Sequence, residues 1–267
     1  MTIIFITGAS SGIGESMARL YAKRGVQLGL VARRADFLER LAKQLEPRPA
    51  LYVLDVRDAV ALQSAANDFI TRFGVPDIVI ANAGVSRGTL TESVDDLPIF
   101  QEVFDINVMG MVNTFHPFVV PMKQQNRGTL VGIASVAGFR GIPGGGAYSA
   151  SKAAAIRYCE SLRVELRGSG ISVVTICPGY IKTPMTAVNK FKMPFLIDVD
   201  AAAIRFARAI DAKSSFTVIP WTMGLAGRIL RLMPNWLYDR VFSIQQPDRF
   251  YDRTLPNPLS YRRHHHR

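Results

Sequence analysis

The chain has 267 residues, of which 48% are hydrophobic and 20% are charged, with 21 glycines and 15 prolines. This composition excludes a disordered, collagen-like or disulfide-rich miniprotein, and the length fits one large α/β domain with a single core. Basic residues exceed acidic residues by 11, a balance that favours nucleic acid, anionic membranes or phosphorylated ligands as partners. More than half of this excess lies in residues 213–267, which hold nine basic and three acidic residues.

Short apolar runs rich in β-branched residues alternate along the chain with longer segments of helical periodicity. The predicted strands are 2–7, 27–32, 50–55, 78–81, 128–134, 171–177 and 216–219, and the predicted helices are 14–24, 35–45, 60–73, 100–120, 148–167 and 201–210. Strands that are apolar throughout are typical of parallel sheets covered on both faces. The alternation therefore predicts an α/β fold with a doubly wound parallel sheet. We expect one catalytic domain over 1–220, a substrate lid over about 183–199 and a C-terminal extension over 221–267.

A glycine-rich segment, TGASSGIG at positions 7–14, joins the first predicted strand to the first predicted helix. Glycines at such a junction let the backbone turn tightly and approach a diphosphate, which the free N–H groups of the helix start then bind. The position in the first strand–helix–strand unit favours dinucleotide binding over an ordinary turn. The predicted contacts are Gly8, Ser10, Ser11, Gly12, Ile13 and Gly14.

The end of the second strand predicts which dinucleotide binds. An acidic residue there would accept a hydrogen bond from the adenosine ribose, but Ala32 occupies this place and Arg33 and Arg34 follow it. Guanidinium groups suit a phosphate, so the sequence favours NADP(H) over NAD(H), with Arg33 expected to contribute more than Arg34. The alternative is that both arginines only begin a solvated helix.

Tyr148 and Lys152 are four residues apart at the start of a predicted helix, so their side chains share one face. A lysine ammonium beside a phenol favours the phenolate and makes tyrosine usable in proton transfer. Ser135 ends the fifth predicted strand, at the carboxyl edge where open α/β sheets bind ligands. Asn107 is a polar residue in an apolar helical pattern and needs a specific partner.

Six motifs follow one another in an order that resembles the compact, single-domain branch of the short-chain dehydrogenase/reductase family. They are the glycine turn, Asn82-Ala83-Gly84, Asn107, Ser135, Tyr148-x-x-x-Lys152 and Pro178-Gly179. The resemblance covers about residues 2–220. It implies a Rossmann-type sheet of seven strands in the order 3-2-1-4-5-6-7, NAD(P)-dependent interconversion of a carbonyl and a secondary alcohol, and a homo-oligomer, either dimer or tetramer.

The resemblance also implies a role for each matching residue. Tyr148 would be the general acid in ketone reduction and the base in alcohol oxidation, and Lys152 would lower its pKa and hold the nicotinamide ribose. Ser135 would polarise the substrate oxygen, and Asn107 would support a water-linked proton relay. The further cofactor contacts it implies are Asp55 and Val56 at the adenine, Asn82, Ala83 and Gly84 beside the adenosine ribose, Pro178 and Gly179 after the sixth strand, and Ile181 and Thr183 at the carboxamide.

The substrate pocket is expected in the segments that carry no motif. Its predicted lining is Ala137, Phe139, Ile142, Met185 and Phe191. An apolar lining suggests a hydrophobic carbonyl compound, such as a long-chain ketone, a 3-oxoacyl lipid or a polycyclic ketone, although the same residues would serve equally well as lid packing. Arg140, in the same region, is expected to face solvent.

The C-terminal extension interleaves apolar residues with Arg228, Arg231 and Arg240. A basic amphipathic segment of this kind can lie on an anionic membrane. It can also close the pocket or pack against a second subunit, and packing is the commoner use of this periodicity.

Other features restrict the function only broadly. Cys159 and Cys177 lie in apolar runs and are expected to be buried thiols of an intracellular protein. We expect a cytoplasmic protein, with peripheral membrane contact through the extension as the alternative. Nucleic-acid-binding motifs and metal-ligand spacings do not accompany the basic charge, so we expect neither partner and a small-molecule substrate. A reductase or dehydrogenase of a sugar or polysaccharide precursor and a non-catalytic NADP(H)-binding regulator are the alternative functions.

Overall fold

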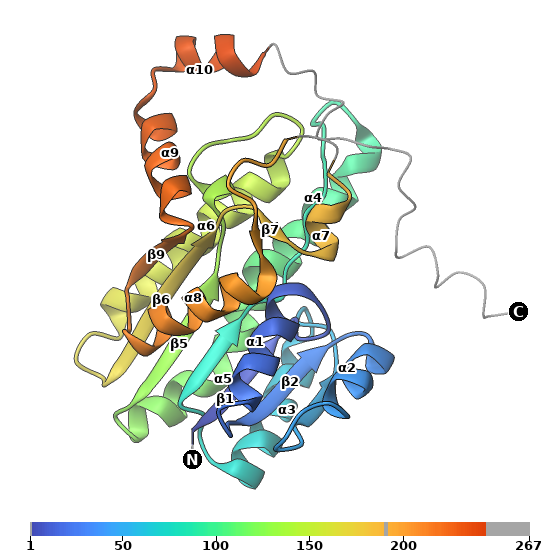
Figure 1. Cartoon of the computed structure of the whole chain (residues 1–267), viewed down its shortest axis with the longest axis vertical. Coiled ribbons are helices and arrows are strands. Elements are labelled where there is room, and N and C mark those ends of the chain that lie inside the picture. Colours follow the sequence, from blue (N-terminus) through green and yellow to red (C-terminus); the bar gives the residue numbers. More distant parts are fainter. Residues whose placement is uncertain (1, 190–191, 244–267) are drawn as a thin grey trace, which may run out of the picture.

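Figure 1 shows a computed structural model of the chain, which describes residues 2–189 and 192–243. Seven parallel strands form one sheet in the order β3-β2-β1-β4-β5-β6-β9. Their bounds are β1 Ile3–Thr7, β2 Gln27–Ala32, β3 Ala50–Val53, β4 Ile78–Ala81, β5 Gly128–Ile133, β6 Ile171–Pro178 and β9 Phe216–Ile219. Two short strands, β7 (Ile181–Lys182) and β8 (Ile197–Asp198), pair separately. The predicted Rossmann-type order is thus confirmed, with β9 as the seventh strand of the sheet.

Ten α-helices are defined within the described residues. They are α1 Gly12–Ala22, α2 Ala35–Ala42, α3 Ala59–Phe73, α4 Leu97–Phe104, α5 Gly110–Gln124, α6 Gly146–Glu165, α7 Pro184–Ala187, α8 Val199–Asp211, α9 Trp221–Leu232 and α10 Asn235–Phe242. Short 3-10 turns at Val94–Asp96 and Val136–Gly138 precede α4 and follow β5.

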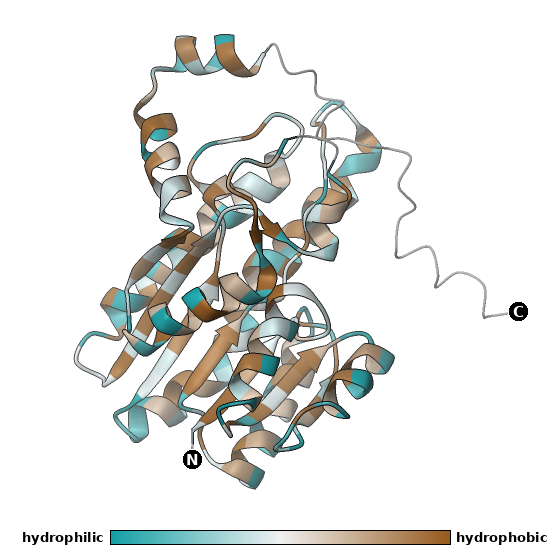
Figure 2. Cartoon of the chain, viewed as in Figure 1, coloured by the Kyte–Doolittle hydropathy of each residue, from teal (hydrophilic) through white to brown (hydrophobic). Residues whose placement is uncertain are grey.

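The helices cover both faces of the sheet. One face packs against α1, α2 and α8, where Tyr21, Leu38 and Phe206 are at most 2% exposed. The other packs against α3, α5 and α6, where Phe69, Phe115 and Cys159 are fully buried. Figure 2 shows the sheet as the brown, hydrophobic interior between these layers. The uniformly apolar strands of the sequence predict this arrangement, because a sheet with helices on both faces buries the side chains on both sides of each strand.

The helix predicted over 100–120 is confirmed as part of one helical run from Leu97 to Gln124, which contains a π-helical turn. The turn, at Asp105–Met109, separates α4 from α5. The apolar periodicity continues through the turn, so the sequence pattern could not show it. A π-turn widens the helix by one residue and often occurs at functional sites, and here it holds Asn107.

The last two helices rise from the end of β9 and lie over the carboxyl edge of the sheet (Figure 1). Arg140, in the loop before α6, holds them there: one of its guanidinium nitrogens donates to the backbone oxygens of Leu230 and Met233 at 3.0 and 2.9 Å, and the other to Asn235. The expectation that Arg140 faces solvent was wrong, because the unpaired carbonyls at the end of α9 attract its charge. No helix among the described residues is long and apolar enough to cross a membrane.

Candidate active site

The glycine turn forms a tight cradle between β1 and α1. Gly8 has a φ of +69°, and a Cβ there would lie 2.7 Å from the Cα of Ala83; a Cβ on Gly14 would lie 2.3 Å from the carbonyl oxygen of Gly8. Only glycine fits at both positions. Helix α1 begins at Gly12, and the Ser11 side chain makes no capping bond within the described residues, so the N–H groups at the helix start are free to bind an anion.

The end of β4 is bonded to this turn. The side-chain nitrogen of Asn82 donates to the backbone oxygens of Thr7 and Gly8, each at 3.1 Å. The Thr7 hydroxyl accepts from the backbone nitrogens of Asn82 and Ala83 at 3.3 and 3.4 Å. Thr7 is a structural residue of the site that sequence reasoning did not single out, because its partner strand lies 75 residues away.

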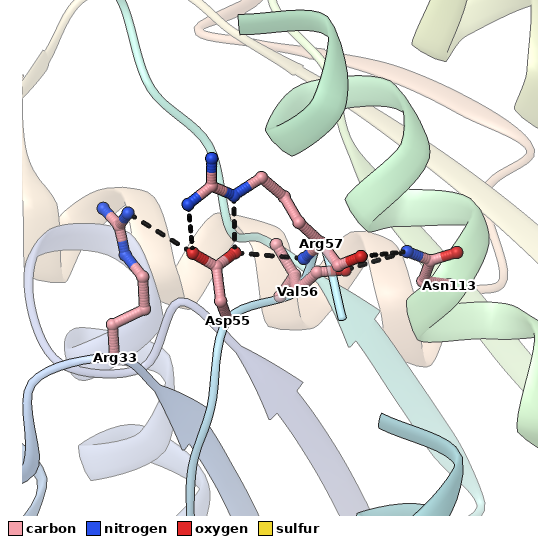
Figure 3. Close-up of polar contacts among 5 residues, drawn as sticks. All are labelled: Arg33, Asp55, Val56, Arg57 and Asn113. Carbon is pink, nitrogen blue, oxygen red and sulfur yellow. Dashed lines mark hydrogen bonds and ion pairs between the residues drawn. The ribbon is translucent and has the colours of Figure 1, made fainter. Parts of the chain in front are cut away.

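Three arginines, Arg33, Arg34 and Arg57, lie near one end of the cleft, after the ends of β2 and β3. Asp55 accepts two side-chain bonds and one backbone bond from Arg57, at 2.7 to 3.1 Å, and pairs with Arg33 at 3.6 Å (Figure 3). Burial opposes ionisation of Asp55, but these bonds and the two positive charges hold its pKa below the ordinary value. Asn113 donates to the backbone oxygen of Val56 and fixes the segment from the side of α5. Sequence reasoning did not single out Arg57, because no motif includes it.

Arg34 lies against the glycine turn. Its guanidinium donates to the hydroxyls of Ser10 and Ser11 at 3.1 and 3.0 Å and stacks over the Phe37 ring at 4.1 Å. The Arg33 guanidinium reaches towards Asp55 instead. Both arginines line the same cleft, so positive charge is present on two sides of this end of the cleft.

Ser135, Tyr148 and Lys152 meet at the carboxyl edge of the sheet. The Ser135 hydroxyl accepts from the backbone nitrogen of Ala137 at 3.1 Å, which leaves its own proton free to donate. Burial raises the pKa of Tyr148, and the Ser135 hydrogen bond opposes the rise. Lys152 is 5% exposed, and burial lowers its pKa to about 8. Its ammonium donates to the backbone oxygen of Ile133 at 2.9 Å and lies 5.9 Å from the centre of the Tyr148 ring.

Asn107 lies beneath this group and does not line the cleft. It is 1% exposed, and its amide exchanges two hydrogen bonds with the Val85 backbone, at 2.8 and 2.9 Å. It also donates to the Ser151 hydroxyl at 3.0 Å. Asn107 and Lys152 approach each other beside Gly84, where a Cβ would lie 3.2 Å from the amide oxygen and 3.5 Å from the ammonium.

One cleft of about 290 Å³ joins these parts. Most of the predicted cofactor residues line it: Gly8, Ser10, Ser11, Gly12, Ile13, Arg33, Arg34, Asp55, Val56, Asn82, Ala83, Gly84, Tyr148, Lys152, Pro178, Gly179, Ile181 and Thr183. Gly14 lies below the turn, where its role is close packing. A Cβ on Gly12 would lie 3.3 Å from the Thr183 side chain, so the end of β7 closes over the turn.

A second cavity of about 360 Å³ opens from the first and shares Ser135, Tyr148, Gly179, Met185 and Thr186 with it. The predicted pocket residues Ala137, Phe139, Ile142 and Met185 line it, and Phe191 lies outside the described residues. Its far wall comes from α9 and α10 and consists of Met223, Ala226, Gly227, Leu230, Tyr238 and Phe242. Closure of the pocket was one of the predicted roles of the extension, but the sequence could not say which residues face inwards.

The comparisons with known proteins agree with this geometry. A family model described as short chain dehydrogenase matches residues 2–193. The chain belongs to the short-chain dehydrogenase/reductase family. Its relatives in this family include an uncharacterized oxidoreductase of Myxococcus xanthus, which is 38% identical over 88% of this chain and 93% of that protein. The 11-beta-hydroxysteroid dehydrogenase A of Sesamum indicum is 36% identical over 69% of this chain, which matches about half of that enzyme, 53%.

A solved structure of the same family is also similar. The alcohol dehydrogenase of Thermococcus sibiricus, complexed with 5-hydroxy-NADP, superposes with a TM-score of 0.74 at 28% identity and covers 82% of this chain and 96% of its own. Membership of this short-chain dehydrogenase/reductase family makes the protein an oxidoreductase that interconverts carbonyl and alcohol groups with a nicotinamide dinucleotide.

Proposed function

We propose that the protein is an NADP(H)-dependent reductase of an apolar ketone, or the corresponding alcohol dehydrogenase. The observation that carries the proposal is the junction of two cavities at Ser135 and Tyr148. One cavity has a glycine cradle and arginines suited to a dinucleotide, and the other has a largely apolar wall suited to a carbonyl compound. The NADP analogue in the Thermococcus enzyme and the hydroxysteroid activity named for the Sesamum relative support the two halves of the assignment.

The coenzyme fits the residues present. Gly8 and Gly14 let the glycine turn pack tightly against Ala83 and Asn82 beside the cleft. Arg33 and Arg34 line the cleft and supply cations for a phosphate, and no acidic side chain stands at Ala32. The nicotinamide, when bound, supplies or accepts the hydride. A net surplus of positive charge at the adenosine end, from Arg33, Arg34 and Arg57 against Asp55, favours the extra phosphate of NADP(H).

The side chains of the site perform the proton transfer and the positioning. Ser135 donates its hydroxyl proton to the carbonyl oxygen, and the bond that it accepts from the Ala137 backbone fixes the position of the hydroxyl. Tyr148 gives its proton to the same oxygen as negative charge develops there. The Lys152 ammonium stabilises the phenolate that remains. The bond to the Ile133 backbone oxygen fixes the position of the ammonium. Asn107 keeps the Val85 segment in place beside Lys152.

Replacing Tyr148 tests the catalytic assignment. A Tyr148→Phe variant keeps the ring and loses only the hydroxyl, so we expect NADPH to bind as in the wild type while turnover falls by roughly 100-fold or more. The measurement is NADPH consumption with a panel of apolar ketones, beside NADPH binding by calorimetry. Turnover retained in Tyr148→Phe would end the assignment, and binding without turnover by the wild type on any ketone would favour the regulatory alternative.

A further inference from the structure

Helices α9 and α10 have two apolar faces, and among the described residues one lines a cavity while the other is exposed. The inner face lines the substrate cavity through residues such as Met223, Leu230 and Tyr238. The outer face of the two helices consists of Trp221, Leu225, Ile229, Leu232, Trp236 and Val241. Their exposed fractions are 73%, 54%, 56%, 83%, 69% and 44%. Large apolar side chains gathered at this exposure are uncommon on soluble proteins and mark an interaction surface.

The spacing shows that the exposed residues of α9 form one stripe. Trp221, Leu225 and Ile229 succeed each other at intervals of four residues, and Leu232 follows three later. Such residues share one side of a helix. On the short α10, Trp236 lies outside while Tyr238 turns inwards. Figure 2 shows both helices as alternating brown and teal segments at the end of the molecule farthest from the N-terminus.

Charge indicates what the outer face binds. Arg228 and Arg240 are exposed and lie beside the apolar stripe, each within four residues of an exposed tryptophan, leucine or isoleucine. Residues 221–267 contain eight arginines and three aspartates. The segment that follows α10 therefore has the same charge sign as the face and does not complement it. A second copy of the face would bring like charges together as well, which costs energy.

We propose that the outer face of α9–α10 docks on the surface of an anionic phospholipid membrane. Apolar side chains beside arginines match the boundary between acyl chains and anionic headgroups, where arginine keeps its charge in water along an apolar stem. Helix α9 has 12 residues, which is too short for the ~20 that a membrane-spanning helix needs. The helix thus lies along the surface, with the substrate cavity directly behind it.

The two tryptophans of the chain make the proposal directly testable. Trp221 and Trp236 are the only tryptophans, and both lie on the outer face. The full-length protein is mixed with vesicles of phosphatidylcholine and with vesicles of phosphatidylcholine and phosphatidylglycerol in equal parts. We expect flotation with the anionic vesicles and a blue shift of tryptophan emission there, and little of either with phosphatidylcholine alone. Absence of anionic-vesicle binding would overturn the proposal.

Two paired variants locate the contact. Leu225→Ser/Ile229→Ser removes apolar surface, and its control, Val60→Ser/Val164→Ser, changes residues that are 77% and 61% exposed on α3 and α6. Arg228→Glu/Arg240→Glu reverses charge, and its control, Lys23→Glu/Lys123→Glu, makes the same change elsewhere on the surface. We expect each test variant to lower the vesicle partition coefficient by roughly 30-fold or more, from the usual contribution of two such residues, and each control to leave it within a few fold.

The remaining outcomes are also decisive. Vesicle binding that both test variants retain would place the contact elsewhere and overturn the proposal. A wild-type oligomer that Leu225→Ser/Ile229→Ser dissociates, with no vesicle binding, would show that the face is a subunit interface. The reductase assignment fails separately, since Tyr148→Phe is expected to bind vesicles as the wild type does, and the docking variants are expected to reduce a water-soluble ketone at the wild-type rate.

Discussion

The residues of the site divide into groups that we propose contact the cofactor and groups that hold those in position. Lys152 belongs to the first, and its environment is costly: it is a buried amine whose pKa burial lowers from 10.5 to about 8. Buried titratable groups with strongly shifted pKa values are common in catalytic sites. Asn107 and Thr7 belong to the second, because their hydrogen bonds are satisfied by backbone groups of neighbouring segments.

Lys152→Met is expected to stabilise the cofactor-free protein while it abolishes turnover. Below pH 8 the wild-type lysine is charged in both the folded and unfolded states, and the folded state bears the cost of burial. The lowered pKa and the lost bond to Ile133 together predict a gain of roughly 2 kcal/mol for the variant at neutral pH. Above pH 10.5 neither state is charged, so the gain should vanish as the pH rises from 8 to 10.5. Urea unfolding of both proteins across this pH range measures the difference in unfolding free energy. A variant destabilised equally at every pH would contradict the prediction.

Arg33→Ala is expected to change the choice of coenzyme. Loss of this guanidinium removes one cation from the adenosine end and leaves Arg57 to neutralise Asp55. The ratio of kcat/KM for NADPH to that for NADH should fall by roughly 10-fold or more, because a charge-assisted bond to phosphate contributes at least about 1.5 kcal/mol. Arg57→Ala is the matched comparison, since it removes the same charge outside the cleft lining. An unchanged ratio in Arg33→Ala would assign the preference to Arg34.

At the scale of elements, the parts that the sequence predicted are those fixed by local pattern. The glycine turn, the Tyr148 and Lys152 pair and the strand order depend on spacing within one or two elements or on the family pattern. The π-turn around Asn107 and the Arg140 contacts do not follow from local pattern. The apolar periodicity continues through the π-turn, and the Arg140 bonds join residues 90 to 95 positions apart. Arg140 was expected in solvent because nothing near it in the chain indicates its partners.

Arg140 holds the far wall of the proposed substrate cavity in place. Besides its bonds to α9 and α10, its guanidinium lies 4.2 Å from the centre of the Tyr238 ring, and the Tyr238 hydroxyl donates to the backbone oxygen of Gly141. Arg140→Leu should remove the bonds from the guanidinium to the carbonyls at the end of α9 and loosen both helices. We expect KM for an apolar ketone to rise by roughly 10-fold, from the loss of about 1.5 kcal/mol or more, while NADPH binds as before, because Arg140 lies outside the cofactor cleft. An Arg167→Leu control changes an exposed arginine at the end of α6.

At the scale of the whole molecule, one cofactor cleft takes residues from both halves of the sheet. Gly8 and Arg33 come from the side of β1 and β2, whereas Tyr148 and Gly179 come from α6 and the end of β6. Strands β1 and β4 pair between these halves, so the sheet is continuous. We expect cofactor binding across this junction to stabilise both halves together. Arg140 joins α9–α10 to the loop before α6, so these helices should respond as well.

NADPH is accordingly expected to stabilise the sheet and the C-terminal helices in a single transition. At a free concentration of about 100 times Kd the apparent unfolding free energy should rise by about 2.7 kcal/mol. Circular dichroism follows the whole fold, and tryptophan emission follows α9–α10, because Trp221 and Trp236 are the only two tryptophans. The two melting curves should coincide with and without NADPH. If the tryptophan transition came earlier and did not respond to NADPH, the C-terminal helices would be a separate unit.

In Arg140→Leu the two melting curves should separate, since that variant removes the bonds that join α9–α10 to the loop before α6.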